Sequence, residues 1–148
     1  MTTKTLDTAL LRIAYDEWNP DAARSVVLLH GWPDSPRCWA AVAPVLAQQG
    51  WRVLVPALRG FAPTRFLRTD TPRTGQLSAL GRDLLEFVDA LGLRQPAFVG
   101  HDWGARAAAN ACGLTSRCIR TGIAGAMRPA IRPMPPTKPR CTRLPCST

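Results

Sequence analysis

The chain has 148 residues, enough for one domain with a buried core of several strands and helices. Its formal net charge is +9, but up to Asp102 eleven Lys and Arg nearly balance ten acids, whereas eight Lys and Arg and no acid follow from Trp103 onward. This distribution excludes a uniformly basic nucleic-acid-binding domain, because almost all of the excess charge belongs to the end of the chain.

Two further classes are excluded by the pattern of residues. The first residues lack the apolar core and cleavage site of a signal peptide, and no later run is long enough to span a membrane. We therefore expect a soluble, cytoplasmic protein with no membrane partner. The five cysteines show neither metal-ligand spacing nor an export signal that would favour disulfides, so we expect no metal and no cofactor.

Apolar patterns predict strands and helices in alternation. In chain order these are strands over 10–15 and 25–30, a helix over 37–49, a strand over 52–56, a helix over 76–91, a strand over 96–99 and a helix over 105–111. The first helix would bury Trp39, Val42, Val45 and Leu46. This order predicts an α/β fold with a mostly parallel sheet and flanking helices. The loops over 30–34, 57–61 and 99–105 should then converge at one edge of the sheet, where such folds place their sites.

The pattern changes after the last predicted helix. Residues 113–148 contain six prolines, seven Lys or Arg and no acid. We interpret 8–112 as the folded part and 113–148 as a basic, proline-rich tail that is disordered. The abrupt change near residue 112 also suggests a shifted reading frame, which the other frames of the coding DNA would test.

One motif carries the functional prediction. Val99 to Ala105 read VGHDWGA, in which Asp102 stands between Gly100 and Gly104 at the end of a predicted strand and before a predicted helix. This is the pattern of a nucleophile elbow, in which small residues let the turn close while the central residue points outward. Together with HGWPD at 30–34 and RGF at 59–61, it resembles the epoxide hydrolase and haloalkane dehalogenase branch of the α/β-hydrolase superfamily. The resemblance covers residues 8–112.

The resemblance implies a specific chemistry. A carboxylate at the elbow can attack an alkyl carbon directly, so Asp102 would be the nucleophile and would form an ester with an epoxide or alkyl halide. The backbone N–H groups of Trp32 and Trp103 would hold the oxyanion that forms when the ester is hydrolysed, and both residues would contact substrate. The family often has a cis peptide bond where Trp32–Pro33 stands. We expect His30, Gly31, Pro33, Gly100, His101 and Gly104 to shape the loops.

Simpler roles stay open for the same residues. Asp102 could cap the helix that follows it, and the two tryptophans could be core aromatics. We expect Arg59 to anchor its loop through a carboxylate rather than to contact substrate. His30 and His101 are expected to be structural rather than to transfer protons.

The sequence also departs from the family pattern. Family members supply a His base, an orienting acid and a helical lid after the elbow, whereas no His follows His101 and no Asp or Glu follows Asp102. We therefore expect the α/β-hydrolase core to be truncated after the elbow helix, with an exposed strand ending at Val99, and the chain to be an incomplete, inactive epoxide hydrolase-like fragment.

A haloalkane dehalogenase-like hydrolase is the alternative enzyme. A basic-tail binding protein and a catalytically dead scaffold are the alternatives without activity, although the lack of aromatic residues after Trp103 disfavours nucleic acid as a partner. The sequence does not indicate an oligomeric state.

Overall fold

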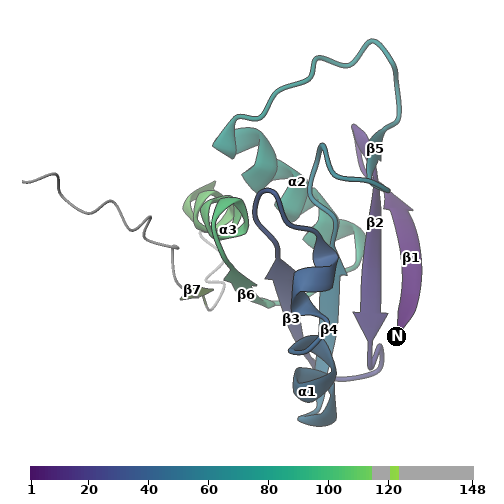
Figure 1. Ribbon diagram of the computed structural model, residues 1–148, viewed down its shortest axis with the longest axis vertical. Coiled ribbons are helices and arrows are strands. Elements are labelled where there is room, and N and C mark those ends of the chain that lie inside the picture. The colour runs from purple at the N-terminus through teal and green to yellow at the C-terminus, as the bar shows by residue number, and fades with distance from the viewer. Residues whose placement is uncertain (115–120, 124–148) are drawn as a thin grey trace, which may run out of the picture.

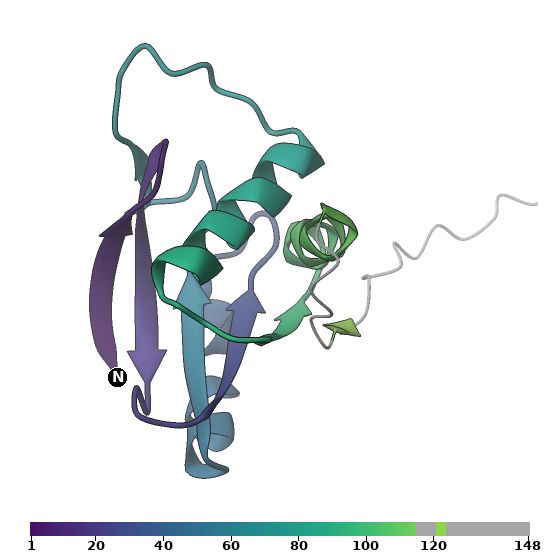
Figure 2. The same cartoon turned by 180° about the vertical axis from the view of Figure 1, so that it is seen from behind.

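A computed structural model describes residues 1–114 and 121–123, and the latter three by their backbone. A single mixed sheet forms the centre of the molecule, with helices on both of its faces (Figures 1 and 2). Its strands are β1 (Thr2–Asp7), β2 (Leu11–Trp18), β3 (Arg24–Leu29), β4 (Trp51–Pro56), β5 (Arg65–Phe66), β6 (Ala97–Gly100) and β7 (Thr121–Ile123). The helices are the 3-10 turn η1 (Pro36–Trp39), α1 (Ala43–Gln48), α2 (Leu77–Ala90) and α3 (Trp103–Leu114).

The strand order is β1-β2-β4-β3-β6-β7, with the short β5 paired to β2. The pairs β3–β4, β3–β6 and β6–β7 are parallel, whereas β2 runs antiparallel to β1, β4 and β5. The carboxyl ends of β3, β4 and β6 therefore point the same way, toward the top of Figure 1. The predicted parallel arrangement is confirmed for these strands.

Two apolar clusters hold the layers together. On one face α2 and α3 pack on β2, β3 and β4. Phe87 lies in this cluster and is 1% exposed, and its ring meets that of Tyr15 edge-on with the ring centroids 5.2 Å apart. On the other face Trp39 and Ala43 cover Val26 and Val53. Strands β3 and β4 alternate between the clusters, so both of their faces are buried, as their continuous apolar runs predict.

Several predicted boundaries differ from the structure. The helix predicted over 37–49 is divided into η1 and α1, and Val42 and Val45 are exposed rather than buried. Pro44 lies in the first turn of α1, where its lack of an N–H costs no hydrogen bond, so the helix restarts there. Neither β1 nor β5 was predicted, and the sheet begins at Thr2 rather than at residue 8. The polar composition of β1 hides it, because it is an exposed edge strand.

The predicted end of the folded part also differs. Helix α3 continues to Leu114, past the boundary expected at residue 112. Strand β7 lies within the segment expected to be disordered, and it pairs with β6, so the strand ending at Val99 is not the exposed edge that was expected. The rest of residues 113–148 lies outside the described residues. In the described part of the chain, no helix combines the length and apolar character that a membrane crossing requires.

Candidate functional site

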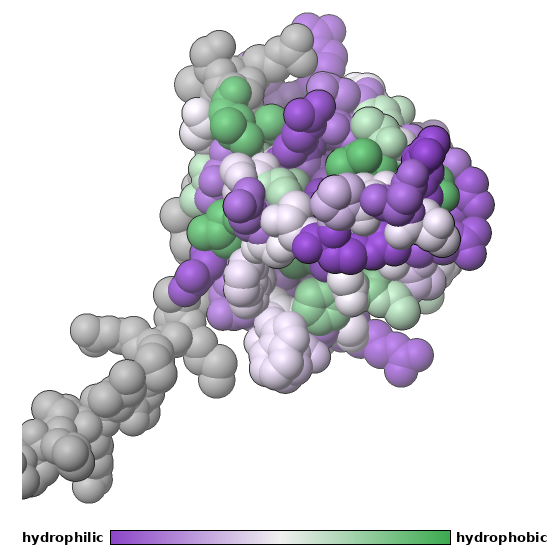
Figure 3. All heavy atoms as spheres, turned by 90° about the horizontal axis from the view of Figure 1, so that it is seen from above, coloured by the Kyte–Doolittle hydropathy of each residue, from purple (hydrophilic) through white to green (hydrophobic). Residues whose placement is uncertain are grey.

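Three loops meet above the carboxyl ends of the parallel strands (Figure 1). They follow β3, β4 and β6 and contain HGWPD, RGF and the VGHDWGA turn, as predicted. Figure 3 views this side of the molecule, where hydrophobic residues are interspersed with strongly hydrophilic ones. The fold thus brings together residues that are about 70 positions apart in sequence, such as Trp32 and Asp102.

The turn after β6 has the backbone geometry of a nucleophile elbow. Asp102 adopts a φ of +50°, in the left-handed region that is costly for residues with a side chain. Side chains at the flanking positions would not fit: a Cβ on Gly100 would lie 2.6 Å from the carbonyl carbon of Gly104, and one on Gly104 would collide with the backbone of Leu29. The two glycines therefore let α3 approach the sheet closely enough for the turn to close, which is the role expected for them.

The Asp102 carboxylate accepts a hydrogen bond from a different loop. Its Oδ2 accepts a hydrogen bond of 2.9 Å from the backbone N–H of Trp32. The backbone N–H groups of Trp32 and Trp103 hold the pKa of Asp102 below its ordinary value. A helix-capping aspartate accepts instead from the second or third N–H of its own helix. The geometry therefore favours an ionised carboxylate held by backbone N–H groups, one from the loop after β3 and one from the first residue of α3.

Gly31 brings the first loop against this carboxylate. A Cβ at Gly31 would lie 2.6 Å from Cβ of Asp102 and 2.9 Å from its Oδ2. Only a residue without a side chain lets the N–H of Trp32 reach the carboxylate. The Trp32–Pro33 peptide bond that follows is cis, as the resemblance implies. The Trp32 side chain is 68% exposed, which contradicts its alternative interpretation as a core aromatic.

His30 is fully buried and joins two of the loops. Its Nδ1 lies 3.0 Å from the carbonyl oxygen of Gly31, and its Nε2 accepts a hydrogen bond of 3.1 Å from the N–H of Leu58. The Phe61 ring meets it edge-on at 4.7 Å. Burial lowers the pKa of His30, so the ring is neutral, with its proton on Nδ1. These contacts indicate a loop-shaping role, as expected.

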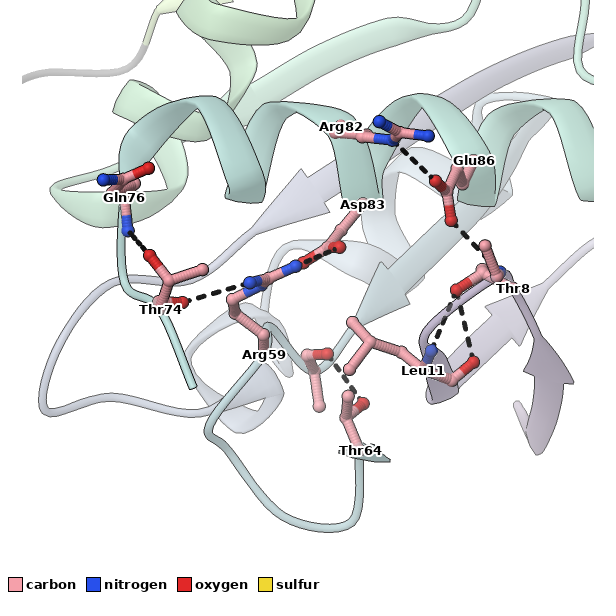
Figure 4. A network of polar contacts seen from close by, with 11 residues as sticks. Thr8, Leu11, Arg59, Thr64, Thr74, Gln76, Arg82, Asp83 and Glu86 are labelled. Carbon is pink, nitrogen blue, oxygen red and sulfur yellow. Dashed lines mark hydrogen bonds and ion pairs between the residues drawn. The ribbon is translucent and has the colours of Figure 1, made fainter. Parts of the chain in front are cut away.

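Arg59 is also structural. Its guanidinium forms two hydrogen bonds with the carboxylate of Asp83 on α2, and a third, of 3.0 Å, with the carbonyl oxygen of Thr74 (Figure 4). The side chain of Arg59 is only 6% exposed. Burial raises the pKa of Asp83, although Arg59 opposes that shift. The expectation that Arg59 anchors its loop through a carboxylate is confirmed, and its partner Asp83 could not be identified from the sequence.

A cavity of about 740 Å³ opens beside the elbow. Its wall is largely apolar and includes both tryptophans of the predicted site, Trp32 and Trp103, together with Phe61, Phe66 and Leu80. Trp103 is half-buried and also packs against the core cluster. The long segment between β4 and α2 supplies most of the wall, and no sequence motif marks it except RGF. The volume is ample for a small organic molecule.

His101 lies on the other side of Asp102, away from this wall. Its Nε2 is 3.5 Å from Sγ of Cys38 and 3.7 Å from Oδ2 of Asp34. Burial raises the pKa of the Cys38 thiol to about 11, with the nearby Asp34 adding to the shift, so this thiol is no competing nucleophile. The sequence gives Cys38 no assigned role, because it lacks metal-ligand spacing with nearby residues and its neighbour His101 is 63 residues away.

Comparison with known proteins agrees with this geometry. Residues 24–125 match the family model described as alpha/beta hydrolase fold. Epoxide hydrolase A of Mycobacterium tuberculosis is 33% identical over 104 residues, which are 70% of this chain and 32% of that protein. A soluble epoxide hydrolase of a Corynebacterium strain is 40% identical over 80 residues, which are 53% of this chain and 26% of that protein.

Solved structures give the same result. A Klebsiella pneumoniae protein provisionally named an epoxide hydrolase superposes with a TM-score of 0.71 at 47% identity, over 72% of this chain and 35% of that one. Epoxide hydrolase A of Mycobacterium thermoresistibile superposes with a TM-score of 0.69 at 26% identity, over 82% and 38%. The chain thus spans about a third of the length of these relatives. The elbow, the loops that meet it and the match over residues 24–125 agree: the chain belongs to the α/β-hydrolase fold family and is epoxide hydrolase-like within it.

Proposed function

We propose that this chain is an epoxide hydrolase-like hydrolase in which Asp102 is the nucleophile. The observation that supports this most is the hydrogen bond from the Trp32 N–H to Oδ2 of Asp102, made at a turn with left-handed backbone geometry. That bond holds one carboxylate oxygen and leaves the other to attack. Backbone strain maintained at one position and an ionised carboxylate beside a cavity are typical of catalytic sites.

The first step would proceed as follows. Oδ1 of Asp102 attacks a ring carbon of the epoxide, the carbon–oxygen bond of the ring breaks, and the released alkoxide takes a proton from solvent. The product is a hydroxyalkyl ester on Asp102, heavier than the enzyme by the full mass of the epoxide. When water then attacks the carboxyl carbon, negative charge develops on Oδ2, which the Trp32 N–H already holds, so this N–H and that of Trp103 would act as the oxyanion hole.

For the 148-residue chain by itself we propose that the reaction stops at the ester. Water at neutral pH is a poor nucleophile toward an alkyl ester and needs a general base. His30 is occupied by Gly31 and Leu58 through its two ring nitrogens, so it has no free position for a water. The expected behaviour is one alkylation per chain without release of the diol.

The proposal is tested by mass spectrometry of the intact chain after incubation with a small aryl epoxide. We expect a single adduct of the epoxide's mass, located on Asp102 by peptide mapping. Asp102→Asn is the matched control, because asparagine tolerates the left-handed backbone but its amide does not attack an epoxide. Adducts on other acids, or an equal yield in Asp102→Asn, would exclude Asp102 as the nucleophile, and sustained diol release would exclude the single turnover.

A haloalkane dehalogenase-like hydrolase is the second candidate. The observation that favours it is the position of Trp103, whose side chain lines the cavity next to Asp102 and could donate its indole N–H to a departing halide. A primary alkyl bromide distinguishes the two candidates: the adduct then carries the alkyl group without bromine, and bromide appears in solution. Faster alkylation by the bromide than by the epoxide would favour this reaction class.

A further inference from the structure

Three potential metal ligands meet on the side of the elbow that the proposed reaction does not use. Asp34 lies in the loop after β3, Cys38 in η1, and His101 at the end of β6. One atom from each side chain lies within 4.8 Å of the other two. This is the one such group of three in the part of the chain that the structure describes.

The separations between the atoms fit a tetrahedral metal ion. With Zn–S of about 2.3 Å and Zn–N and Zn–O of about 2.1 Å, tetrahedral angles place sulfur and nitrogen about 3.6 Å apart and nitrogen and oxygen about 3.4 Å apart. The structure has 3.5 Å between Sγ of Cys38 and Nε2 of His101, and 3.7 Å between Nε2 and Oδ2 of Asp34. The carboxylate oxygen of Asp34 and Sγ of Cys38 lie within 4.8 Å of each other, compared with about 3.6 Å in a tetrahedral site.

The neighbours of His101 fix its ring in place. The Trp39 ring packs against it with centroids 5.8 Å apart, and Nδ1 faces Gly31, where a Cβ would approach it to 3.1 Å. Nε2 is thus directed at Cys38 and Asp34. The side chains of His101 and Asp34 are 31% and 48% exposed, so an ion reaches the group from solvent. A ring held in place by packing loses little freedom when it binds a metal.

From this juxtaposition we propose that Asp34, Cys38 and His101 form a binding site for a borderline-soft divalent cation, of which Zn²⁺ fits best. A thiolate and an imidazole select such ions over Mg²⁺ or Ca²⁺, which prefer oxygen ligands. A thiolate and a carboxylate neutralise the charge of the ion, and the thiol proton passes to solvent. With three protein ligands, the fourth position is left to water. The ion would tie the loop after β3 to the elbow.

The site can be tested in a chain in which Cys38 is the only cysteine, made by the substitutions Cys112→Ser, Cys118→Ser, Cys141→Ser and Cys146→Ser. Titration calorimetry with ZnCl₂ should show one ion per chain, and Co²⁺ should give the near-ultraviolet charge-transfer band of a thiolate ligand. Even outer-shell partners of metal sites are worth about 10- to 100-fold in affinity, so Cys38→Ser and Asp34→Asn should each weaken Zn²⁺ binding by at least tenfold. Asp70→Asn is the matched control, because Asp70 is an exposed acid that pairs with Arg68.

A second measurement needs no variant. In the unsubstituted chain, Zn²⁺ should slow the alkylation of Cys38 by iodoacetamide at least tenfold, measured by peptide mass spectrometry with Cys112 as the internal reference. Absence of Zn²⁺ binding by the chain with Cys38 alone, equal affinity in Cys38→Ser, or unprotected Cys38 would each overturn the proposal. None of these outcomes depends on whether Asp102 reacts with an epoxide.

Discussion

The Arg59–Asp83 pair is the most specific structural support of the loop that forms the cavity wall. The two side chains are 6% and 12% exposed, and the guanidinium also holds the carbonyl oxygen of Thr74, just before α2 (Figure 4). Removing one member of a buried pair leaves an uncompensated charge and costs about 3–5 kcal/mol. Asp83→Ala should therefore lower the free energy of unfolding by this amount, measured by urea denaturation followed by far-ultraviolet circular dichroism.

Replacing both members should cost much less. Arg59→Met combined with Asp83→Leu leaves no buried charge and loses mainly the hydrogen bond to Thr74, which is worth about 1 kcal/mol. In a double-mutant cycle that makes Arg59→Met and Asp83→Leu singly and together, each single variant should cost about 3–5 kcal/mol, and the double variant should lose several kcal/mol less than their sum. A double variant as unstable as the sum of the single variants would refute the pairing.

The two single variants should also differ in their dependence on pH. In Arg59→Met the buried Asp83 can take up a proton, because burial raises its pKa. An acid whose pKa is raised by folding binds more protons in the folded state, so the stability of this variant should recover as the pH falls from 7. Asp83→Ala leaves a buried guanidinium that cannot lose its proton, so its deficit should persist. Parallel pH profiles for the two variants would contradict this reasoning.

Three further predictions concern the elbow and the core. Gly31→Ala should slow the alkylation of Asp102 by an aryl epoxide at least tenfold, measured by mass spectrometry of the adduct, because the new Cβ would displace the carboxylate. Gly113→Ala is the control and should react at the normal rate, because a Cβ at Gly113 meets nothing within 4 Å. The pH at which the alkylation rate falls to half should lie below 3.8, the ordinary pKa of an aspartate, because the N–H groups of Trp32 and Trp103 lower the pKa of Asp102. A midpoint above pH 4 would contradict this. Phe87→Ala should lower the free energy of unfolding, measured by urea denaturation, by about 3–5 kcal/mol. Val45→Ala, on the exposed face of α1, should change it by no more than about 0.5 kcal/mol. Similar losses in the two variants would refute the assigned core.

Local patterns were sufficient for much of the fold. The continuous apolar runs of β3 and β4 predicted strands covered on both faces, and the helical spacing of α2 predicted its buried face, because these periodicities follow from burial against a sheet. The elbow could also be located from its own residues, since the glycines on either side of Asp102 meet a steric requirement that arises within a few positions of the turn. The exposed strand β1 and the division of the first predicted helix left no such pattern.

The residues expected to carry the chemistry can be named from local motifs, whereas their contacts depend on how the chain folds. The motif places a carboxylate between glycines, but the Trp32 N–H that holds Asp102 comes from a loop 70 residues away. Asp83 becomes the partner of Arg59 only when α2 packs on the sheet, and Cys38 becomes a neighbour of His101 only when the segments that follow β3 and β6 meet at one edge. Hydrogen bonds and ion pairs act over a few ångströms in space, and a single sequence records no distance between residues far apart along the chain.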